Sequence, residues 1–447
     1  MMSTMASDDH QAVACHSAAG ATVADAVANP LGAVPPDLRP RFVRGGVWSD
    51  ALSAFAGEGA AVDPIGLATV LTFGYALGTR TVLRGVETDR VDPEGFPARH
   101  APSDGDLLEL TLEAVRRHVG APRWGAERPT VLLSGGRDSR LILLAMRRLG
   151  IRPRCILTLD QAGSGSDAAI AERLASAVGE RVERVHPLAF DGAHELERHV
   201  AQGFQSLEHA WFVAIARRVR VLSGPVTDGI GAGVLSTGSL LHPEAIALWN
   251  ACDLSGLGAW TAAHGGHVSP RFLAAARAEG VPLAARDQVE AEFAAAMRSL
   301  ASTPNPLGMY SLLHWSRRGI GASAYGLLPR DRVVTPLYDR ELCAAIAAMP
   351  MDRAMSRDWR EIVLGQLDDT GVPFSVAEGG MLPRWMRHPW RTIRSRGGWA
   401  RFVRGLPEPL ARLARVADEG TGMRRTFDRG AVGLLAALDG AVGFTRR

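Results

Sequence analysis

The sequence predicts an α/β fold built on a parallel, doubly wound β-sheet, with a helical C-terminal region. Apolar segments of strand length alternate with amphipathic segments of helix length between residues 130 and 186. This alternation is typical of parallel sheets whose strands are joined by right-handed helical crossovers. In addition, the first of these strands runs directly into a glycine-rich turn that opens a helix, as ligand-binding α/β domains do.

The elements follow from the local patterns in chain order. Strands are predicted where short apolar runs end in turn residues, at Thr130–Leu133, Cys155–Leu159, Arg181–His186 and Gly224–Thr227. Helices are predicted where apolar residues recur at helical spacing, at Asp106–Val119, Ser139–Leu149 and Asp167–Val178. We expect a sheet of five or more strands, with its ligand crevice at the carboxyl ends of the strands.

The turn after the first strand carries the clearest functional signal. It has the sequence Ser134-Gly135-Gly136-Arg137-Asp138-Ser139. The glycines let backbone N–H groups approach a ligand, the helix N-terminus favours an anion, and the serine hydroxyls are further donors. Asp138 would repel a phosphate unless a divalent cation lay between them, so the turn predicts a Mg²⁺-bound polyphosphate with Asp138 as the metal ligand.

This turn is not the common nucleotide loop, which needs Gly-x-x-x-x-Gly-Lys-Ser/Thr, and the chain contains no lysine. The segment from Leu132 to Ser139 instead resembles the loop of the ATP pyrophosphatase (PP-loop) superfamily. Its sequence is most similar to the loop in the synthetase domain of class B asparagine synthetases and their relatives, the β-lactam synthetases and lasso-peptide cyclases. The resemblance implies a PP-loop sheet that uses ATP and Mg²⁺ to join a carboxylate to an amine, releasing AMP and pyrophosphate.

Residue roles follow from that resemblance. It assigns ATP binding to Leu133, Ser134, Gly135, Gly136, Asp138, Ser139, Thr158 and Gly229. Within this set, Leu133 and Thr158 would lie against the adenine. Asp228 and Gly229 would open a second nucleotide loop, in which the family's metal-binding Asp falls on Gly231 or Gly233, depending on the register. Asp228 is then the nearest carboxylate and a candidate base or metal ligand.

A catalytic cation is expected further along the chain. The family places a lysine there to stabilise the acyl transition state, and the matching segment here is Met355–Arg360. Arg357 or Arg360 can supply only a fixed positive charge, and we take Arg360 as the candidate catalytic residue. The alternative, which the sequence favours, is that both arginines lie on a solvated helix face.

The sequence predicts four segments. They are a weakly structured N-terminal segment (1–60), a remnant of an amidotransferase-like domain (61–105), the ATP-pyrophosphatase domain (106–380) and a helical cap rich in Arg and Trp (381–447). The second segment is similar to the junction that precedes the asparagine synthetase domain. The last has a surplus of arginine, which favours either a cap with inward tryptophans or a surface for an acidic peptide, a carrier protein, RNA or a membrane.

The glutaminase machinery of the family is missing. It requires a cysteine at the mature N-terminus, whereas this chain begins Met1-Met2-Ser3-Thr4 and its first cysteine is Cys15. The nitrogen should therefore come from ammonia, from a partner glutaminase or from an amine on the substrate. A carrier protein or a precursor peptide is a further candidate partner, because an amide synthetase of secondary metabolism fits as well as asparagine synthesis. The competing hypothesis is a catalytically idle scaffold that binds the nucleotide.

The composition of the chain bears on its partners, its location and the state of its cysteines. A net charge of +3 gives little reason to expect a nucleic-acid partner, and no segment has the pattern of a signal peptide or a membrane span. The four cysteines are far apart, so we expect reduced thiols in a cytoplasm. His194 and His199 nearly complete a zinc-protease motif, but they are five residues apart and are expected at the surface.

Overall fold

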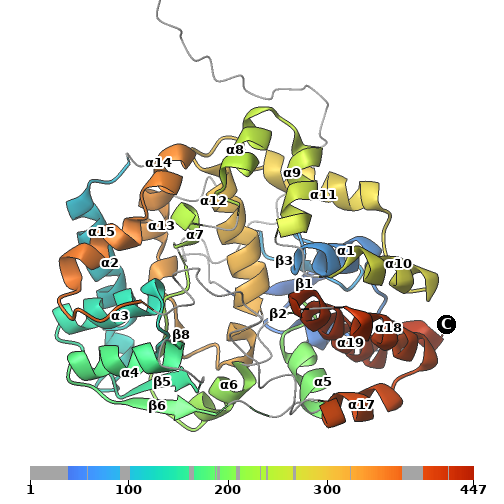
Figure 1. Ribbon diagram of the computed structural model, residues 1–447, viewed down its shortest axis with the longest axis horizontal. Coiled ribbons are helices and arrows are strands. Elements are labelled where there is room, and N and C mark those ends of the chain that lie inside the picture. Colours follow the sequence, from blue (N-terminus) through green and yellow to red (C-terminus); the bar gives the residue numbers. More distant parts are fainter. Residues whose placement is uncertain are drawn as a thin grey trace, which may run out of the picture.

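The computed structural model describes residues 39–57, 59–90, 101–160, 166–186, 188, 192–207, 212–231, 233–237, 240–264, 268–322, 324–374, 396–420 and 422–446. It confirms an α/β architecture with a five-stranded, all-parallel sheet in the order β6-β5-β4-β7-β8 (Figure 1). The strands are β4 (Thr130–Leu132), β5 (Cys155–Leu159), β6 (Val182–Val185), β7 (Val226–Thr227) and β8 (Val333–Val334).

β4 lies in the middle of this sheet, and all three of its residues are buried. Val131 pairs with Ile156 on one side and with Thr227 on the other, and all three are buried. A strand that is buried on both faces is expected in the centre of a parallel sheet. The carboxyl ends of β4, β5 and β7 consequently meet along one edge, where the loops after them come together.

The three helices predicted around these strands are present, with ends shifted by no more than two residues. They are α2 (Asp104–His118), α3 (Arg137–Arg148) and α4 (Asp167–Ala177). Ser103 and Ser166 cap the first and the last of them by accepting hydrogen bonds from backbone N–H groups of the first turn. The predicted domain boundary after residue 105 thus falls inside α2.

The remaining helices lie around and beyond this sheet (Figure 1). They are α1 (Pro64–Phe73), α5 (Gly192–Ala201), α6 (Phe212–Arg220), α7 (Val234–Thr237), α8 (Pro243–Asn250), α9 (Leu254–His264), α10 (Pro270–Ala278), α11 (Arg286–Arg298), α12 (Pro306–Tyr310), a π-helix (Ser311–Gly321), α13 (Arg340–Ala347), α14 (Met351–Ser356), α15 (Trp359–Leu367), α17 (Arg396–Arg404), α18 (Glu408–Glu419) and α19 (Gly422–Val442). Short 3-10 turns are Leu52–Phe55, Pro122–Trp124, Tyr325–Leu327, Pro336–Tyr338 and Phe444–Arg446.

A second hydrophobic core joins the start of the described chain to its end. A small antiparallel sheet contains β1 (Phe42–Arg44), β2 (Val47–Ser49) and β3 (Glu87–Thr88) in the order β2-β1-β3. Side chains from β1 and α1 share this core with apolar residues of α10, α18 and α19. β1 and β2 are ordered structure inside the segment predicted to be weakly structured, because three-residue strands are too short to leave a periodic pattern.

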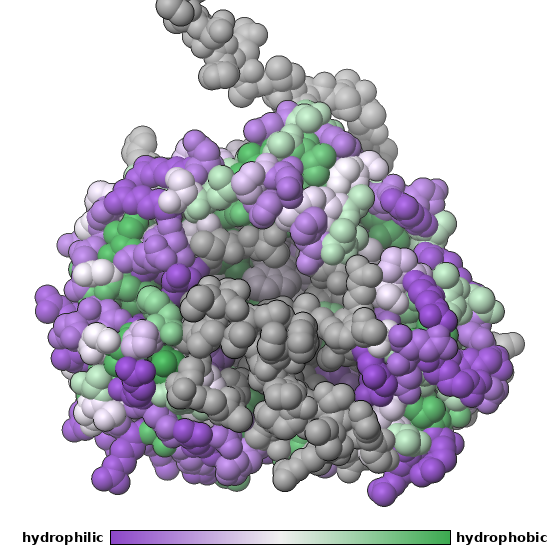
Figure 2. Space-filling view, in the orientation of Figure 1, coloured by the Kyte–Doolittle hydropathy of each residue, from purple (hydrophilic) through white to green (hydrophobic). Residues whose placement is uncertain are grey.

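The C-terminal helices are amphipathic. Leu410 and Leu413 are fully buried, whereas the outward surface over α18 and α19 is mainly hydrophilic (Figure 2). Trp399 is also buried, and its indole N–H donates to Asp418 Oδ1 at 3.1 Å. This arrangement matches the predicted cap with an inward tryptophan, while Trp385, Trp390 and the predicted boundary at residue 381 lie outside the described residues.

The expectation that His199 lies at the surface is wrong. His199 is completely buried, because α5 packs against α19 with the ring beside Gly433. Cys155 and Cys343 are free thiols. No helix in the described part of the chain is long and apolar enough to cross a membrane.

Candidate functional site

The turn between β4 and α3 is held in shape by its two serines. The backbone N–H of Ser134 donates to Ser139 Oγ at 3.0 Å, and the two hydroxyl oxygens lie 3.1 Å apart. The N–H of Gly136 donates to Ser134 Oγ at 3.2 Å. Because these bonds fix the shape of the turn, an anion bound there would meet groups that are already positioned.

α3 begins at this turn without a side-chain cap. Gly136 occupies the N-cap position, where it has no side chain to accept a hydrogen bond from the first N–H groups of the helix. The positive end of the helix dipole therefore remains available to an anionic ligand. Asp138 lies in the first turn of α3, with 40% of its side chain exposed.

The loop after β7 packs directly on this turn. A Cβ added to Gly229 would lie 2.0 Å from the carbonyl carbon of Asp138 and 2.3 Å from the nitrogen of Ser139. No side chain fits at such distances, so glycine is required for the two loops to touch. The structure thus brings together the predicted first and second loops, although 90 residues separate their sequences (229 − 139).

Of the two positions predicted for the second acid, 231 has no room for a side chain, and at 233 the Asp138 and Arg360 side chains would have to shift. A Cβ on Gly231, whose φ is +146°, would lie 2.3 Å from the backbone of Leu337. A Cβ on Gly233 would lie 2.8 Å from Asp138 Oδ1 and 3.0 Å from Arg360 Nη1. In either register, other atoms occupy the space that the second carboxylate would need. The absence of that carboxylate therefore agrees with the packing of the site.

Asp228 lies at the edge of the same site and is held by two donors. The hydroxyl of Tyr325 and the backbone N–H of Ile230, the latter at 3.0 Å, both donate to Asp228 Oδ1. Burial raises the pKa of Asp228 to about 6, the negative charge of Asp138 adds to the shift, and the two hydrogen bonds oppose it. A carboxyl group with this pKa can exchange a proton near neutral pH, as a general base must.

Arg360 reaches into the space between the two loops. Its Nη1 donates to Asp138 Oδ1 at 2.6 Å, while its Nε and Nη2 donate to Asp358 Oδ1 and Oδ2 at 3.0 and 2.7 Å. Only 8% of the Arg360 side chain is exposed, so the expectation of a solvated helix face is wrong for this residue. Arg357, by contrast, pairs with Asp104 at an exposed position.

The two residues predicted to contact adenine lie at the same edge. Leu133 is buried directly after β4, and its N–H donates to the carbonyl of Leu157 at 2.8 Å. Thr158 is buried in β5, one residue before that strand ends. Both residues therefore lie at adjacent strand ends beside the loop.

The side chains at the loop do not fit a Mg²⁺ ion held by the protein. Mg²⁺ prefers oxygen ligands, commonly one or two carboxylates together with water and phosphate. Asp138 offers one carboxylate, and the guanidinium of Arg360 already occupies its Oδ1. Among the residues that the structure describes, no group of three or more His, Cys, Asp or Glu side chains could hold a metal ion.

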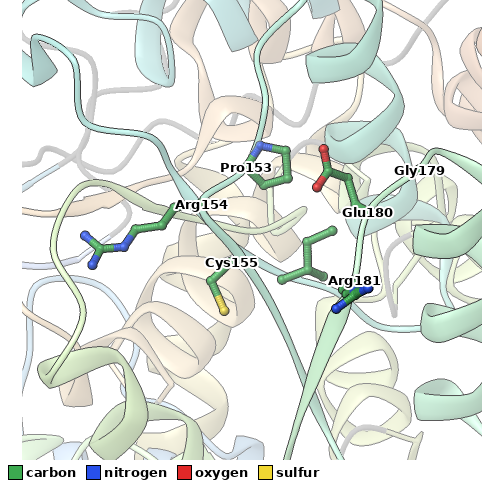
Figure 3. A pocket seen from close by; sticks show the side chains of 7 residues that line it. Pro153, Arg154, Cys155, Gly179, Glu180 and Arg181 are labelled. Carbon is green, nitrogen blue, oxygen red and sulfur yellow. The ribbon is translucent and has the colours of Figure 1, made fainter.

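A pocket elsewhere on the sheet is separate from these loops. Residues just before and at the start of β5 and between α4 and β6 line it, including Pro153, Cys155 and Glu180 (Figure 3). It thus lies at the amino ends of the strands, opposite the edge where ligands bind in open parallel sheets.

Three residues of the site were missed by the sequence analysis. Asp358 caps α15 and clamps Arg360, Ser236 Oγ donates to Asp358 Oδ1 at 3.2 Å, and Tyr325 bonds Asp228. An Asp directly before a helix is a recognisable N-cap signal, so Asp358 could have been noticed. Nothing in the sequence marks Tyr325 or Ser236.

Comparison with known proteins adds no assignment: no family model and no curated protein matches the chain.

Proposed function

We propose that the protein is an ATP-dependent amide ligase of the PP-loop type that forms AMP and pyrophosphate. The observation that carries this proposal is the convergence of three groups at one sheet edge. They are the donor-rich turn Ser134–Ser139, the buried cation Arg360, and Asp228, whose pKa lies near 6. They correspond to the parts that an adenylation reaction needs: an anion cradle, a fixed positive charge and a base.

The proposed reaction has two steps. An oxygen of the substrate carboxylate attacks the α-phosphorus of ATP, and pyrophosphate leaves into the turn formed by Ser134, Gly135, Gly136 and Ser139. An amine then attacks the acyl carbon of the adenylate, AMP leaves, and the amine proton passes to Asp228. Arg360 stabilises the negative charge that develops in either step, and Leu133 and Thr158 contact the adenine.

The nitrogen donor follows from the same proposal. Ammonia, an amine carried by the substrate, or a partner glutaminase supplies it, in a cytoplasmic setting. A small molecule, a carrier-bound acid or a precursor peptide supplies the carboxylate. An amide-forming step in secondary metabolism, such as β-lactam or macrolactam closure, falls within this chemistry.

A second candidate function is a nucleotide-binding scaffold without turnover. The specific observation in its favour is the charge balance at the loop, where Asp138 and Asp358 both contact the one guanidinium of Arg360. A cation neutralised in this way stabilises a transition state less than an unpaired one would.

Release of pyrophosphate distinguishes the two candidates. The purified chain is incubated with ATP, a panel of carboxylic acids, and ammonium or simple amines, and pyrophosphate is measured over time. An amide ligase releases pyrophosphate only when a suitable acid is present, and Ser139→Ala reduces the rate. The matched control is Ser223→Ala, which removes an exposed hydroxyl before β7. Saturable ATP binding without pyrophosphate release for any acid would favour the scaffold.

A further inference from the structure

The space between Asp138 and Gly233 is filled by a guanidinium group. Arg360 Nη1 lies 2.6 Å from Asp138 Oδ1, and a Cβ on Gly233 would meet both of these atoms within 3.0 Å. A second carboxylate at position 233 and a divalent cation between it and Asp138 would need this same space. The two residues therefore depend on each other. Because Gly233 has no side chain, there is room for the positively charged guanidinium of Arg360.

Arg360 is fixed in place rather than resting there loosely. Asp358 binds two of its nitrogens, and Ser236 Oγ donates to the same carboxylate at 3.2 Å. The side chains of Arg360 and Asp358 are each 8% exposed. A planar, two-pronged contact of this kind orients the guanidinium and leaves its third nitrogen aimed at Asp138.

The charge of Arg360 is permanent. Burial alone would lower the pKa of the guanidinium, but the charges of Asp138 and Asp358 raise it above its ordinary value. Since this positive charge touches Asp138 Oδ1, it disfavours a divalent cation on that oxygen by direct repulsion. The Arg360 side chain thus supplies the positive charge beside Asp138 that the sequence predicts from a metal ion.

We propose that Arg360 is a built-in replacement for the divalent cation of the loop, so that the protein binds the phosphates of ATP without requiring Mg²⁺. This inference rests on the proposed ATP site. Arg360 screens Asp138 from the phosphates, and the N–H groups at the start of α3 with the Ser134 and Ser139 hydroxyls bind the phosphate oxygens. The affinity for ATP is therefore set by the protein alone.

The direct test compares the affinity of the full chain for ATP, by titration calorimetry, in buffer with Mg²⁺ and in buffer with EDTA. We expect dissociation constants that agree within about twofold, a difference of well under 1.4 kcal/mol. A dissociation constant more than about tenfold weaker in EDTA would overturn this inference while leaving the proposed function intact. Absence of ATP binding in both buffers would overturn the proposed function, and this inference with it.

A substitution of Arg360 tests whether this residue makes ATP binding independent of Mg²⁺. Arg360→Gln removes the charge and leaves Asp138 facing the phosphates, so ATP binding should weaken by about tenfold or more in EDTA and recover when Mg²⁺ is added. The control is Arg357→Gln, because Arg357 lies on the same segment and makes only an exposed ion pair. Unchanged, metal-independent binding by a folded Arg360→Gln protein would overturn the proposal.

A gain-of-function variant completes the test. Gly233→Asp combined with Arg360→Ala places a second carboxylate beside Asp138 and removes the side chain that Gly233 accommodates. We expect this double variant to bind Mn²⁺, seen as loss of the free-ion paramagnetic resonance signal, under conditions where the wild type binds none. Equal Mn²⁺ binding by the wild type would contradict the proposal. If the double variant does not fold, the wild-type comparison in Mg²⁺ and EDTA decides alone.

Discussion

Two arginine–carboxylate clusters in this protein use the same chemistry in different surroundings. In α5, Arg198 contacts Glu195 and Gln202, and His199 Nε2 lies 3.2 Å from Glu195 Oε1. The side chains of Arg198 and Glu195 are 1% and 10% exposed. In the loop cluster of Asp138, Arg360 and Asp358, two members are equally hidden, but Asp138 is 40% exposed.

The difference separates a structural role from a functional one. The α5 cluster is almost wholly buried where α5 packs against α19, so we assign it a role in stabilising the packing of these two helices. Burial lowers the pKa of His199 to about 4, and the charge of Arg198 adds to this, so the histidine stays neutral near pH 7. The loop cluster keeps one acid partly exposed beside the turn Ser134–Ser139, where the proposed substrate would meet it.

The largest effect is expected in the closed cluster. Arg198→Met leaves Glu195 charged and buried, and breaking a buried pair in this way costs about 3–5 kcal/mol of unfolding free energy. Urea denaturation followed by circular dichroism measures the loss, and the affinity for ATP of the folded fraction should be unchanged. Arg218→Met is the control, since its pair with Glu183 is about one third exposed and should contribute roughly 0–1 kcal/mol. A loss as small as that of the control would mean that the α5 cluster is not structural.

The loop cluster should respond in activity, which the α5 cluster should not. Arg360→Gln removes the fixed charge from the reaction site, and we expect pyrophosphate release to fall by about 10²–10³-fold, as when one oxyanion donor is removed. Arg357→Gln should change the rate by less than about twofold, because surface substitutions have small effects. Equal rates for the two variants would remove Arg360 from the mechanism.

The contribution of Asp228 to stability should depend on pH. Because burial raises its pKa from 3.8 to about 6, the folded state binds more protons than the unfolded state between these values, and stability from this group is lost as pH rises through that window. Asp228→Asn should therefore be more stable than the wild type above pH 6, by roughly 1–2 kcal/mol after allowance for partial exposure. Thermal unfolding of both proteins from pH 4 to pH 8 measures the difference.

The same group should govern activity in the opposite direction. As a base, Asp228 must be ionised, so kcat/KM should rise with pH through about 6 and then level off. The inflection should be absent in the residual activity of Asp228→Asn. A profile with the same inflection in both proteins would assign it to another group.

The smallest effect is expected at a single hydroxyl of the turn. Ser139→Ala removes an acceptor for Ser134 N–H and a donor for phosphate, and the affinity for ATP should fall by about tenfold or less, since one hydrogen bond contributes about 0.5–1.5 kcal/mol. Ser223→Ala should leave the affinity unchanged. An identical affinity for wild type and Ser139→Ala would show that this hydroxyl does not contact the nucleotide.

The sequence predicts those features of the fold that depend on neighbouring residues. The strands β4, β5 and β6, the helices between them and the turn Ser134–Ser139 all carry local signals of period, capping or glycine content. Because β5, β4 and β7 are parallel neighbours, the predicted loop residues lie at one edge of the sheet.

The rest depends on contacts between distant residues. Arg360 meets Asp138 across 222 positions, and Tyr325 meets Asp228 across 97. An arginine is expected at the surface unless a partner is known, and no pattern in a single chain reveals such a partner. The burial of His199 was missed for the same reason, because α19, which covers it, follows more than 200 residues later.

The central claim is that the turn after β4 binds the phosphates of ATP. Calorimetric titration of the purified full chain with ATP tests this claim directly, with the double variant Ser134→Ala/Ser139→Ala beside the wild type. We expect one saturable site in the wild type and an affinity about 10- to 100-fold weaker in the double variant. No saturable binding by the wild type, or equal binding by the two proteins, would contradict it.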